Sequence, residues 1–402
     1  MSRGVQDFKP ERLRQALAAR KFTQGQLAML VGVSPATVSK WRSGDQAPEA
    51  DALDRLADKL SLASEWFTRP LLGEALTPKY RSNAQALASA RAKLEARMEW
   101  AQEVAMKLGE FANYPTVNIP TRHFTDPDQI SASDIEQSAQ ECRDLWRLGR
   151  SPVQDLALAV ESAGVILVRE ETEISSIEGL SSWSDVLQRP IILLSADKAN
   201  AFRSRFDLAH ELAHVVLHKH IPVATEREQY KKIEKQAHQF AGAFLLPAET
   251  FAADIQVPVT LDSLLILKQR WGVSVAAMLM RLETLGIIDA DDKLSLFKRR
   301  SARWGAKSEP GDDKREAEQP RLLRRTIELL ISSGVMPAPA VPRHLGLSPR
   351  DVEALAGLRD GYFDGPAQVI ELATLRTQHQ STSTDDGRVS GSVVPFHRPR
   401  TN

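Results

Sequence analysis

Hydrophobic positions in the first 70 residues recur every three or four residues in short runs, which is the spacing of amphipathic helices. The pattern predicts four short helices within Leu13–Leu60. Thr23 is a good N-cap for the second helix, and Gly32 allows a sharp turn after it. Ser34 followed by proline predicts the start of a third helix, which Gly44 ends. Two helices joined by a short turn predict an all-α helix-turn-helix domain, with these helices at Gln24–Leu30 and Pro35–Arg42.

Beyond residue 70 the periodicity becomes mixed. A long helix rich in Ala, Arg, Glu and Lys is predicted over Ser82–Phe111, as a spacer or packing arm, and the proline-containing segment Asn113–Pro127 is predicted to be a linker. Two helices, three strands and two further helices follow, an order typical of an α+β layer arrangement. The predicted elements are Ser133–Leu148, Ser151–Ala163, Val165–Arg169, Gly179–Ser184, Pro190–Ser195, Ser204–His218 and Glu234–Leu245.

The C-terminal quarter is predicted to be helical with a polar end. Lys298–Lys314 is charged and is expected to be a surface connection, Pro320–Leu358 is expected to be helical, and the tail from Thr377 is expected to be disordered. Residues 345–352 have glycine, serine and proline at the same relative positions as residues 31–38. We interpret this similarity as a shared turn and helix-capping pattern in preference to a second helix-turn-helix. The predicted domains are therefore 1–70, 71–127, 128–300, 301–376 and 377–402.

Composition narrows the class of protein. The chain has 402 residues, which predicts two or three domains, and its 52 basic and 52 acidic residues balance. Zero net charge argues against a protein that binds nucleic acid or an anionic membrane along its whole length. It still allows one small basic domain. The single cysteine, Cys142, excludes an intrachain disulfide, is expected to be a packing thiol, and suits a cytoplasmic location. The sequence shows no signal peptide and no membrane span.

Histidines cluster in one window: five of the nine lie between residues 210 and 238. On a helix, His210 and His214 project from one face on adjacent turns, so both imidazoles can reach one metal ion. Glu211 lies about 100° round the helix from His210, where a general base for a metal-activated water belongs. The helix is otherwise apolar, and a zinc ion would compensate for burying these polar groups.

A catalytic zinc site needs a third protein ligand. The following predicted helix offers Glu234 and His238, four residues apart on one flank of its apolar face. We favour Glu234, because a carboxylate is the usual partner of two histidines, and His238 would then donate a hydrogen bond to a ligand or to the transition state. His218 continues the series but drifts about 80° from His210, so it is expected to support the site or the fold.

Further sequence around these residues carries a family resemblance. Gly-Leu-Ser-Ser-Trp-Ser, Arg-Pro-Ile-Ile-Leu, Arg-Phe-Asp-Leu-Ala-His-Glu-Leu-Ala-His and Leu-Leu-Pro, all within Gly179–Pro247, are similar to the ImmA/IrrE family of zinc metallopeptidases. The resemblance implies a compact zincin-like domain that cleaves a repressor or regulator protein. It also implies zinc on His210, His214 and Glu234 and a base at Glu211. Asn is common in that family where this chain has His238, which leaves the role of His238 open.

The helix-turn-helix segment supplies candidate DNA contacts. With Leu27, Val38 and similar residues facing inward, Thr37 and Lys40 would face the major groove, with Ser34 and Ala36 at its entry. The residues positioned for phosphates are Lys40, Arg42 and Gln24. Residues 10–67 resemble the Cro/repressor-type, or xenobiotic-response-element-type, helix-turn-helix family, which implies binding to a double-stranded operator. One such module binds weakly, so a homodimer on a two-fold site is expected.

Three functions remain open on the sequence alone. The first is a regulator that binds DNA and cleaves protein. The second is a repressor whose zinc site is a sensor or is inactive. The third is a peptidase whose N-terminal module docks on a partner protein. For cleavage, the strand Pro190–Ser195 is expected to pair with an extended substrate as an added strand.

Overall fold

The computed structural model describes residues 4–72, 85–171, 178–197, 200–224, 226–305 and 308–364. Its contacts group Met1–Phe363 into one compact unit, so the expected domain boundaries within that range stay predictions. The tail expected to be disordered from Thr377 lies outside the described residues. No helix in the described ranges is long and apolar enough to cross a membrane.

The first region is a helical bundle, as the periodicity predicts. Thr23 forms a capping box with Gln26, and the Ser34 hydroxyl accepts the backbone N–H of Thr37. Gly32 and Gly44 adopt left-handed conformations, with φ of 77° and 88°, which end the two helices. The elements are α1 (Pro10–Arg20), α2 (Gln24–Val31), α3 (Pro35–Ser43), α4 (Ala50–Leu60) and the 3₁₀ turn η1 (Ser64–Thr68). This arrangement confirms the helix-turn-helix prediction.

A three-stranded sheet lies next along the chain after the helices α5 (Gln85–Gly109), α6 (Ala132–Leu145) and α7 (Leu156–Ser162). Its strands are β1 (Ile166–Glu170), β2 (Gly179–Ser184) and β3 (Arg189–Ser195), in the spatial order β1-β3-β2. β1 runs parallel to β3, with Val168 opposite Leu193, and β2 runs antiparallel to β3, with Ser181 opposite Ile192. The central strand is therefore the last of the three in sequence.

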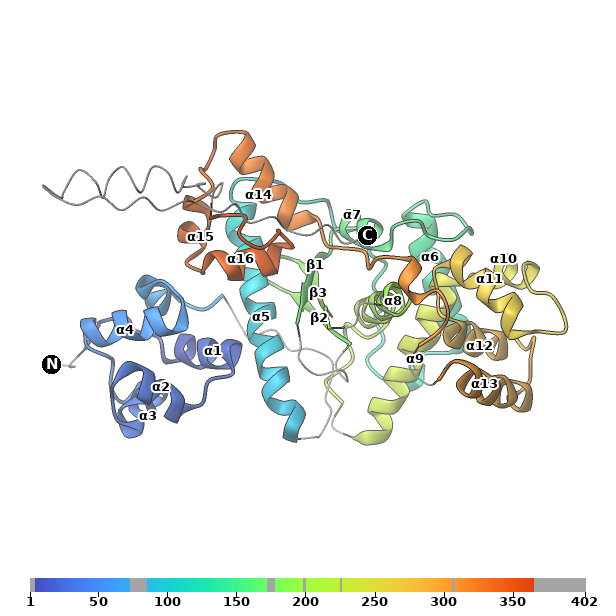
Figure 1. The fold of residues 1–402 in the computed structure, drawn as a ribbon, viewed down its shortest axis with the longest axis horizontal. Helices are drawn as coiled ribbons and strands as arrows, with labels where there is room; N and C mark the ends of the chain where they lie inside the picture. The colour runs from blue at the N-terminus through green and yellow to red at the C-terminus, as the bar shows by residue number, and fades with distance from the viewer. Residues whose placement is uncertain are drawn as a thin grey trace, which may run out of the picture. The chain divides into compact units, whose positions relative to one another are not determined.

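The two faces of this sheet belong to two different cores. Ile191 and Leu193 face the core that includes α5, whereas Ile192 and Leu194 face the core that includes α8 (Ala201–Leu217). The alternation follows from the two-residue period of a strand. Figure 1 shows the sheet between α5 and α8, which contact it from opposite sides. Because both faces are covered, the middle of the central strand β3 is apolar on both sides.

The helix α5 is a central packing element and no solvated spacer. Leu94, Met98 and Trp100 are fully buried in the core it shares with the helix-turn-helix region and the sheet. From the sequence its charged residues would be predicted to be exposed to solvent. Arg97 and Glu103 are nevertheless buried, because residues distant in sequence form ion pairs with them. The packing-arm interpretation is therefore the correct one of the two.

Helices complete the second core around α8. Cys142 on α6 is fully buried there, which confirms the packing thiol. Burial raises the pKa of its thiol well above the usual range. The surrounding elements are the turn η2 (Pro127–Gln129), α9 (Arg227–Leu245), α10 (Ala248–Ala253), α11 (Leu261–Trp271), α12 (Val275–Thr284) and α13 (Ala290–Trp304).

The C-terminal region packs back on the centre of the unit. The turn η3 (Asp312–Lys314) precedes α14 (Leu322–Ser332), α15 (Ala340–Leu345) and α16 (Pro349–Ala356). Ser348 caps α16 after the left-handed Gly346, as the turn pattern predicts. Val352 and Leu355 are fully buried, and α16 contacts β1 and α5, so this hairpin is a packing element.

Three expectations at the level of elements are wrong. The helix predicted to open at Ser151 begins at Leu156, because Asp155 accepts the backbone N–H of Leu158 and caps it. Lys298–Lys314 is no simple surface connection: α13 includes its first residues, and Glu309 is buried and accepts the backbone N–H groups at the start of α12. The strand Pro190–Ser195 cannot accept an added strand, because β3 pairs on both sides.

Candidate metal centre

The site rests on the contact between α8 and α9, two helices that pack closely along their lengths. Asn200 caps the start of α8 by accepting the N–H of Arg203. The helix then presents His210 and His214 one turn apart, as their spacing predicts. From the facing α9, Glu234 approaches both imidazoles. Three residues separated by up to 24 positions in sequence thus meet at one place.

The ligand-type atoms of these three residues converge. The Nε2 atoms of His210 and His214 lie 3.2 Å apart. One Glu234 carboxylate oxygen lies 3.2 Å from His210 Nε2 and the other lies 3.7 Å from His214 Nε2. All the atoms of the group fit within 4.8 Å of one another. The structure therefore brings together the three residues that the sequence analysis selects as ligands, and it does not include His238 among them.

A chain of hydrogen bonds behind His214 determines which of its ring nitrogens carries the proton. The Gln236 amide nitrogen donates to the Pro127 carbonyl at 2.7 Å, so the Gln236 amide oxygen faces His218 Nε2, 3.3 Å away. His218 Nε2 then donates, and its Nδ1 accepts from His214 Nδ1 at 3.0 Å. In neutral rings this order leaves the His214 Nε2 lone pair directed toward His210 and Glu234. His218 is fully buried, and its predicted supporting position is confirmed.

Glu211 is buried against the start of β2. Burial raises the pKa of Glu211 to about 7, although the charge on His210 and a hydrogen bond from Ser181 act in the opposite direction. Gly179 is the residue that leaves space for this carboxylate: a Cβ atom there would lie 2.9 Å from Glu211 Cγ and 3.1 Å from one carboxylate oxygen. Any larger residue would force Glu211 to move.

His238 lies beside the three converging residues and also lines a neighbouring cavity. Its ring centroid is 4.5 Å from that of His210, and its Nδ1 donates to the Glu234 carbonyl at 2.7 Å. In the neutral ring Nε2 is then an acceptor, so donating to a transition state would require a protonated His238. Burial, followed by the charge on His210, lowers the pKa of His238, which disfavours that form. The donor role of His238 stays a prediction, and it requires a protonated ring that the lowered pKa disfavours.

A cavity of about 440 Å³ opens next to His238. Phe206, one turn before His210, packs against the His238 ring at 5.8 Å and lines the cavity with Met280 and Phe297. Charged side chains from Arg203 and Glu178, which pair at 2.9 Å, lie at the same cavity. Space of this size beside the cluster could receive part of an extended chain.

Sequence reasoning missed Gly179, Ser181 and Gln236 as parts of the site. Gly179 carried one usable signal, because a glycine inside a strand pattern often marks a close approach of other atoms. Ser181 and Gln236 are ordinary polar residues in elements assigned to packing, and only the contacts between elements reveal them.

The predicted DNA-contacting residues divide into two groups. Ser34, Ala36 and Lys40 are exposed on α3 or at its start. The Ser34 hydroxyl also contacts the Thr37 hydroxyl at 2.9 Å, and Thr37 is half-buried. Gln24 and Arg42, both half-buried, bond to each other: Arg42 donates to the Gln24 amide oxygen at 3.0 Å. All six lie on the helix-turn-helix, and their contact with DNA stays a prediction.

Two regions of the chain match known protein families. Residues 160–283, which include β1 to α9 and the whole cluster, match the family model described as the IrrE N-terminal-like domain of a peptidase family. Residues 13–67 match a family model described as helix-turn-helix. No curated protein gives a significant match to the chain. These matches confirm the resemblance of both regions at the level of the domain.

Proposed function

We propose that this chain, which joins a helix-turn-helix domain to an IrrE-like domain of a peptidase family, is a cytoplasmic DNA-binding regulator with a zinc-dependent endopeptidase site. The observation that carries the proposal is the spacing of the ligand-type atoms. Atoms that bind one tetrahedral zinc at about 2.0–2.1 Å lie about 3.3 Å from one another. The two Nε2 atoms lie 3.2 Å apart, and the two Glu234 oxygens lie 3.2 Å from His210 Nε2 and 3.7 Å from His214 Nε2 respectively, which is close to this spacing. Two imidazoles and one carboxylate are also a donor set that zinc takes in hydrolytic sites.

His210, His214 and Glu234 would hold the ion, with the His214 lone pair directed by the His218–Gln236 hydrogen bonds. When bound, zinc supplies Lewis-acid chemistry that activates water and polarises a peptide carbonyl. Glu211 takes the proton from the attacking water and later delivers it to the leaving amine. Gly179 and Ser181 keep this carboxylate beside the site, because one leaves space and the other donates a hydrogen bond.

We propose that an extended substrate pairs with β2. In the described sheet both β1 and β2 are edge strands that pair only with β3, and β2 is the edge strand against which α8 packs. Its first residue, Gly179, touches Glu211, so a segment added along the free edge would pass the catalytic carboxylate. A protein substrate such as a repressor fits this geometry, because a flexible segment of another chain can adopt the extended form.

Gly179→Ala should keep the metal and lose cleavage. The new Cβ would lie within 2.9 Å of Glu211 Cγ, so the carboxylate must move away from the attacking water. A displacement of about 1 Å is expected to lower the rate by about a hundredfold. We would measure zinc by elemental analysis and cleavage on a proteome-derived peptide library by mass spectrometry.

Gly242→Ala on α9 is the matched control for that variant. A Cβ there would meet its nearest atom, Arg281 Cδ, at 3.6 Å, which is ordinary contact, so activity should be unchanged. Equal activity of Gly179→Ala and wild type would show that Glu211 does not need its observed position.

Lys40→Glu together with Arg42→Glu should weaken DNA binding. Both residues belong to α3, and reversing two charges that face phosphates or bases should reduce affinity by roughly a hundredfold or more. The full-length chain would first select its operator from a random DNA pool, and gel retardation would then compare variants. Lys9→Glu with Lys59→Glu changes the charge equally but lies outside α2 and α3, so it should bind almost as wild type. Unchanged DNA binding by the Lys40→Glu, Arg42→Glu variant would contradict the proposed DNA-binding function.

A further inference from the structure

The cavity of about 440 Å³ beside His238 lies at the end of β2 that meets the candidate metal centre. Glu178, the residue before Gly179, lines this cavity. Its carbonyl accepts the Ser195 N–H at 3.0 Å, so Glu178 continues the pairing of β2 with β3. Gly179 in turn lies against Glu211. A polypeptide segment that follows the edge of β2 past this carboxylate would therefore reach the cavity with a residue close to the cleaved bond.

Three helices present large apolar side chains to this cavity. Phe206 comes from α8, Met280 from α12 and Phe297 from α13. Met280 is 50% exposed and both phenylalanines are half-buried, so part of each side chain remains accessible. An apolar side chain of a ligand that enters the cavity would remove its own surface and theirs from water together. Apolar surface gathered at a concave site is typical of a binding pocket.

Charged groups along the same lining already have partners within the protein. Arg203 pairs with Glu178 at 2.9 Å, and Arg300 Nε donates to Glu309 at 2.9 Å. Glu309 also accepts the first two backbone N–H groups of α12, at 2.9 and 3.0 Å. These contacts hold the walls of the cavity in place. A ligand can therefore occupy the cavity without supplying a charge to any of these four groups.

Part of the wall lies beyond the region that matches the peptidase family. The match to the IrrE N-terminal-like domain ends at residue 283, whereas Phe297 belongs to α13. Buried Lys268 of α11 pairs with Glu309 at 3.2 Å and with Asp312, which fastens the segment after α13 to α11. The shape of the cavity therefore depends on helices of this chain that the family match does not include.

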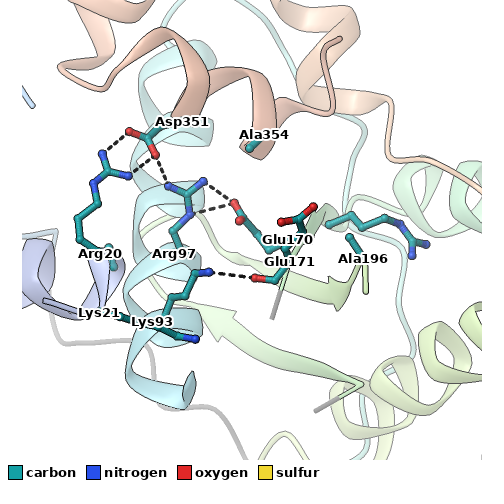
Figure 2. A pocket seen from close by; sticks show the side chains of 11 residues that line it. Arg20, Lys21, Lys93, Arg97, Glu170, Glu171, Ala196, Asp351 and Ala354 are labelled. Atoms are coloured by element: carbon teal, nitrogen blue, oxygen red, sulfur yellow. Dashed lines mark hydrogen bonds and ion pairs between the residues drawn. The ribbon is translucent and has the colours of Figure 1, made fainter. Parts of the chain in front are cut away.

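Another cavity in the described part of the chain, of about 390 Å³, offers a comparison. Figure 2 shows its wall as a chain of ion pairs, in which Arg20 and Arg97 both hold Asp351 and Arg97 also holds Glu170. Among the described residues that line it none is aromatic, and none belongs to the candidate metal centre. An apolar side chain from a segment bound at the metal centre would gain little there, so the cavity beside His238 is the one that suits it.

We propose that the cavity lined by Phe206, Met280 and Phe297 is the specificity pocket of the peptidase site. It receives a large apolar side chain, such as that of leucine, methionine or phenylalanine, from a residue on one side of the cleaved bond. The inference rests on the proposed peptidase function and narrows its substrates to extended segments that carry such a residue. Met280 is flexible enough to adapt to apolar side chains of different shapes, whereas a charged side chain would lose hydration against the two phenylalanines.

Cleavage of a proteome-derived peptide library by the full-length, zinc-loaded chain tests the preference. Mass spectrometry of the products should show a large apolar residue at one fixed position beside the cut. That residue should be favoured over alanine by about tenfold or more, because each methylene missing from an apolar pocket lowers the rate by at least this factor. Cleavage with no apolar preference at any position near the cut would overturn the pocket and leave the peptidase function standing.

A pair of matched variants locates the preference. Met280→Glu places a carboxylate at the cavity, so cleavage beside apolar residues should fall by about tenfold or more, and the share of cuts beside lysine or arginine should rise. Ile266→Glu makes a similar change on α11, at a side chain that is 74% exposed and is not among the described lining residues, so it should keep the wild-type profile. Circular dichroism would show that both variants fold. Identical profiles in the two variants would overturn the assignment.

Photocrosslinking gives a readout that does not depend on cleavage. A peptide mixture with benzoylphenylalanine at one position would be irradiated with the full-length, zinc-loaded Glu211→Gln chain, and mass spectrometry would identify the labelled residues. Label is expected on Met280 or Phe297, and excess peptide with phenylalanine at that position should suppress it more than peptide with glycine. Label only outside the cavity would overturn the proposal. Label in the cavity, with a wild-type chain that cleaves nothing, would support the pocket and contradict the peptidase function.

Discussion

Replacing Glu211 with glutamine should leave zinc bound and lower peptide cleavage by about 10²- to 10⁴-fold. Glutamine keeps the size of the side chain but cannot take a proton from water, and general-base catalysis contributes a factor of this order. Glu211 is not one of the three residues whose atoms converge, so the metal content should stay equal to that of the wild type. Elemental analysis would give the zinc stoichiometry, and mass spectrometry on a proteome-derived peptide library would give the cleavage rate.

Glu228→Gln is the control for that experiment. Glu228 is exposed on the first turn of α9 and pairs with Lys231, away from the cluster, so its loss should affect neither zinc nor cleavage. Cleavage by Glu211→Gln at the wild-type rate would show that another group is the base. Stoichiometric zinc in a wild-type chain that cleaves no peptide would favour the sensor alternative over the peptidase.

Replacing His214 with alanine should reduce zinc affinity by more than about a hundredfold and abolish cleavage with it. Changes to residues that only support a ligand commonly lower metal affinity by about 10- to 100-fold, and His214 would be a ligand itself. Its removal also breaks the hydrogen bond to His218 that begins the chain leading to Gln236. Competition with a chromophoric chelator would measure the affinity of the full-length chain.

His220→Ala provides a control of the same residue type. His220 is exposed beyond the end of α8, where its ring stacks on His123 at 4.6 Å, and it lies outside the converging group. The His220→Ala variant should bind zinc as tightly as the wild type. If His214→Ala binds zinc as tightly as His220→Ala, the assigned ligand set is wrong.

The sequence predicts those parts of the site that depend only on residues close together in the chain. The spacing of His210 and His214 fixes their common face through helix geometry alone, without knowledge of the rest of the fold. Glu234 required one further assumption, that the apolar faces of two consecutive helices pack together, and the structure has that contact. Gln236 could not be inferred, because its function depends on the Pro127 carbonyl more than one hundred residues earlier.

Two of the errors in the fold come from pairing between distant residues, and the third comes from competing local hydrogen bonds. The pattern of each strand was correct, but strand order is a property of the whole sheet, so the central position of β3 was missed. Ser151 has the chemistry of a helix cap, yet its carbonyl binds Arg143 and Asp155 begins the helix instead. The charged segment at Glu309 became buried because Lys268, Arg300 and the start of α12 satisfy its carboxylate.

The hydrogen bonds that run from Pro127 through Gln236 and His218 to His214 limit how this centre could be transplanted. An engineer who grafts the histidine helix alone into a new scaffold would move the imidazoles but leave their proton placement undetermined. Either tautomer of His214 would then be available, and one of them would present an N–H to the incoming ion. A working graft would have to carry the second helix and the turn at Pro127 as one cassette.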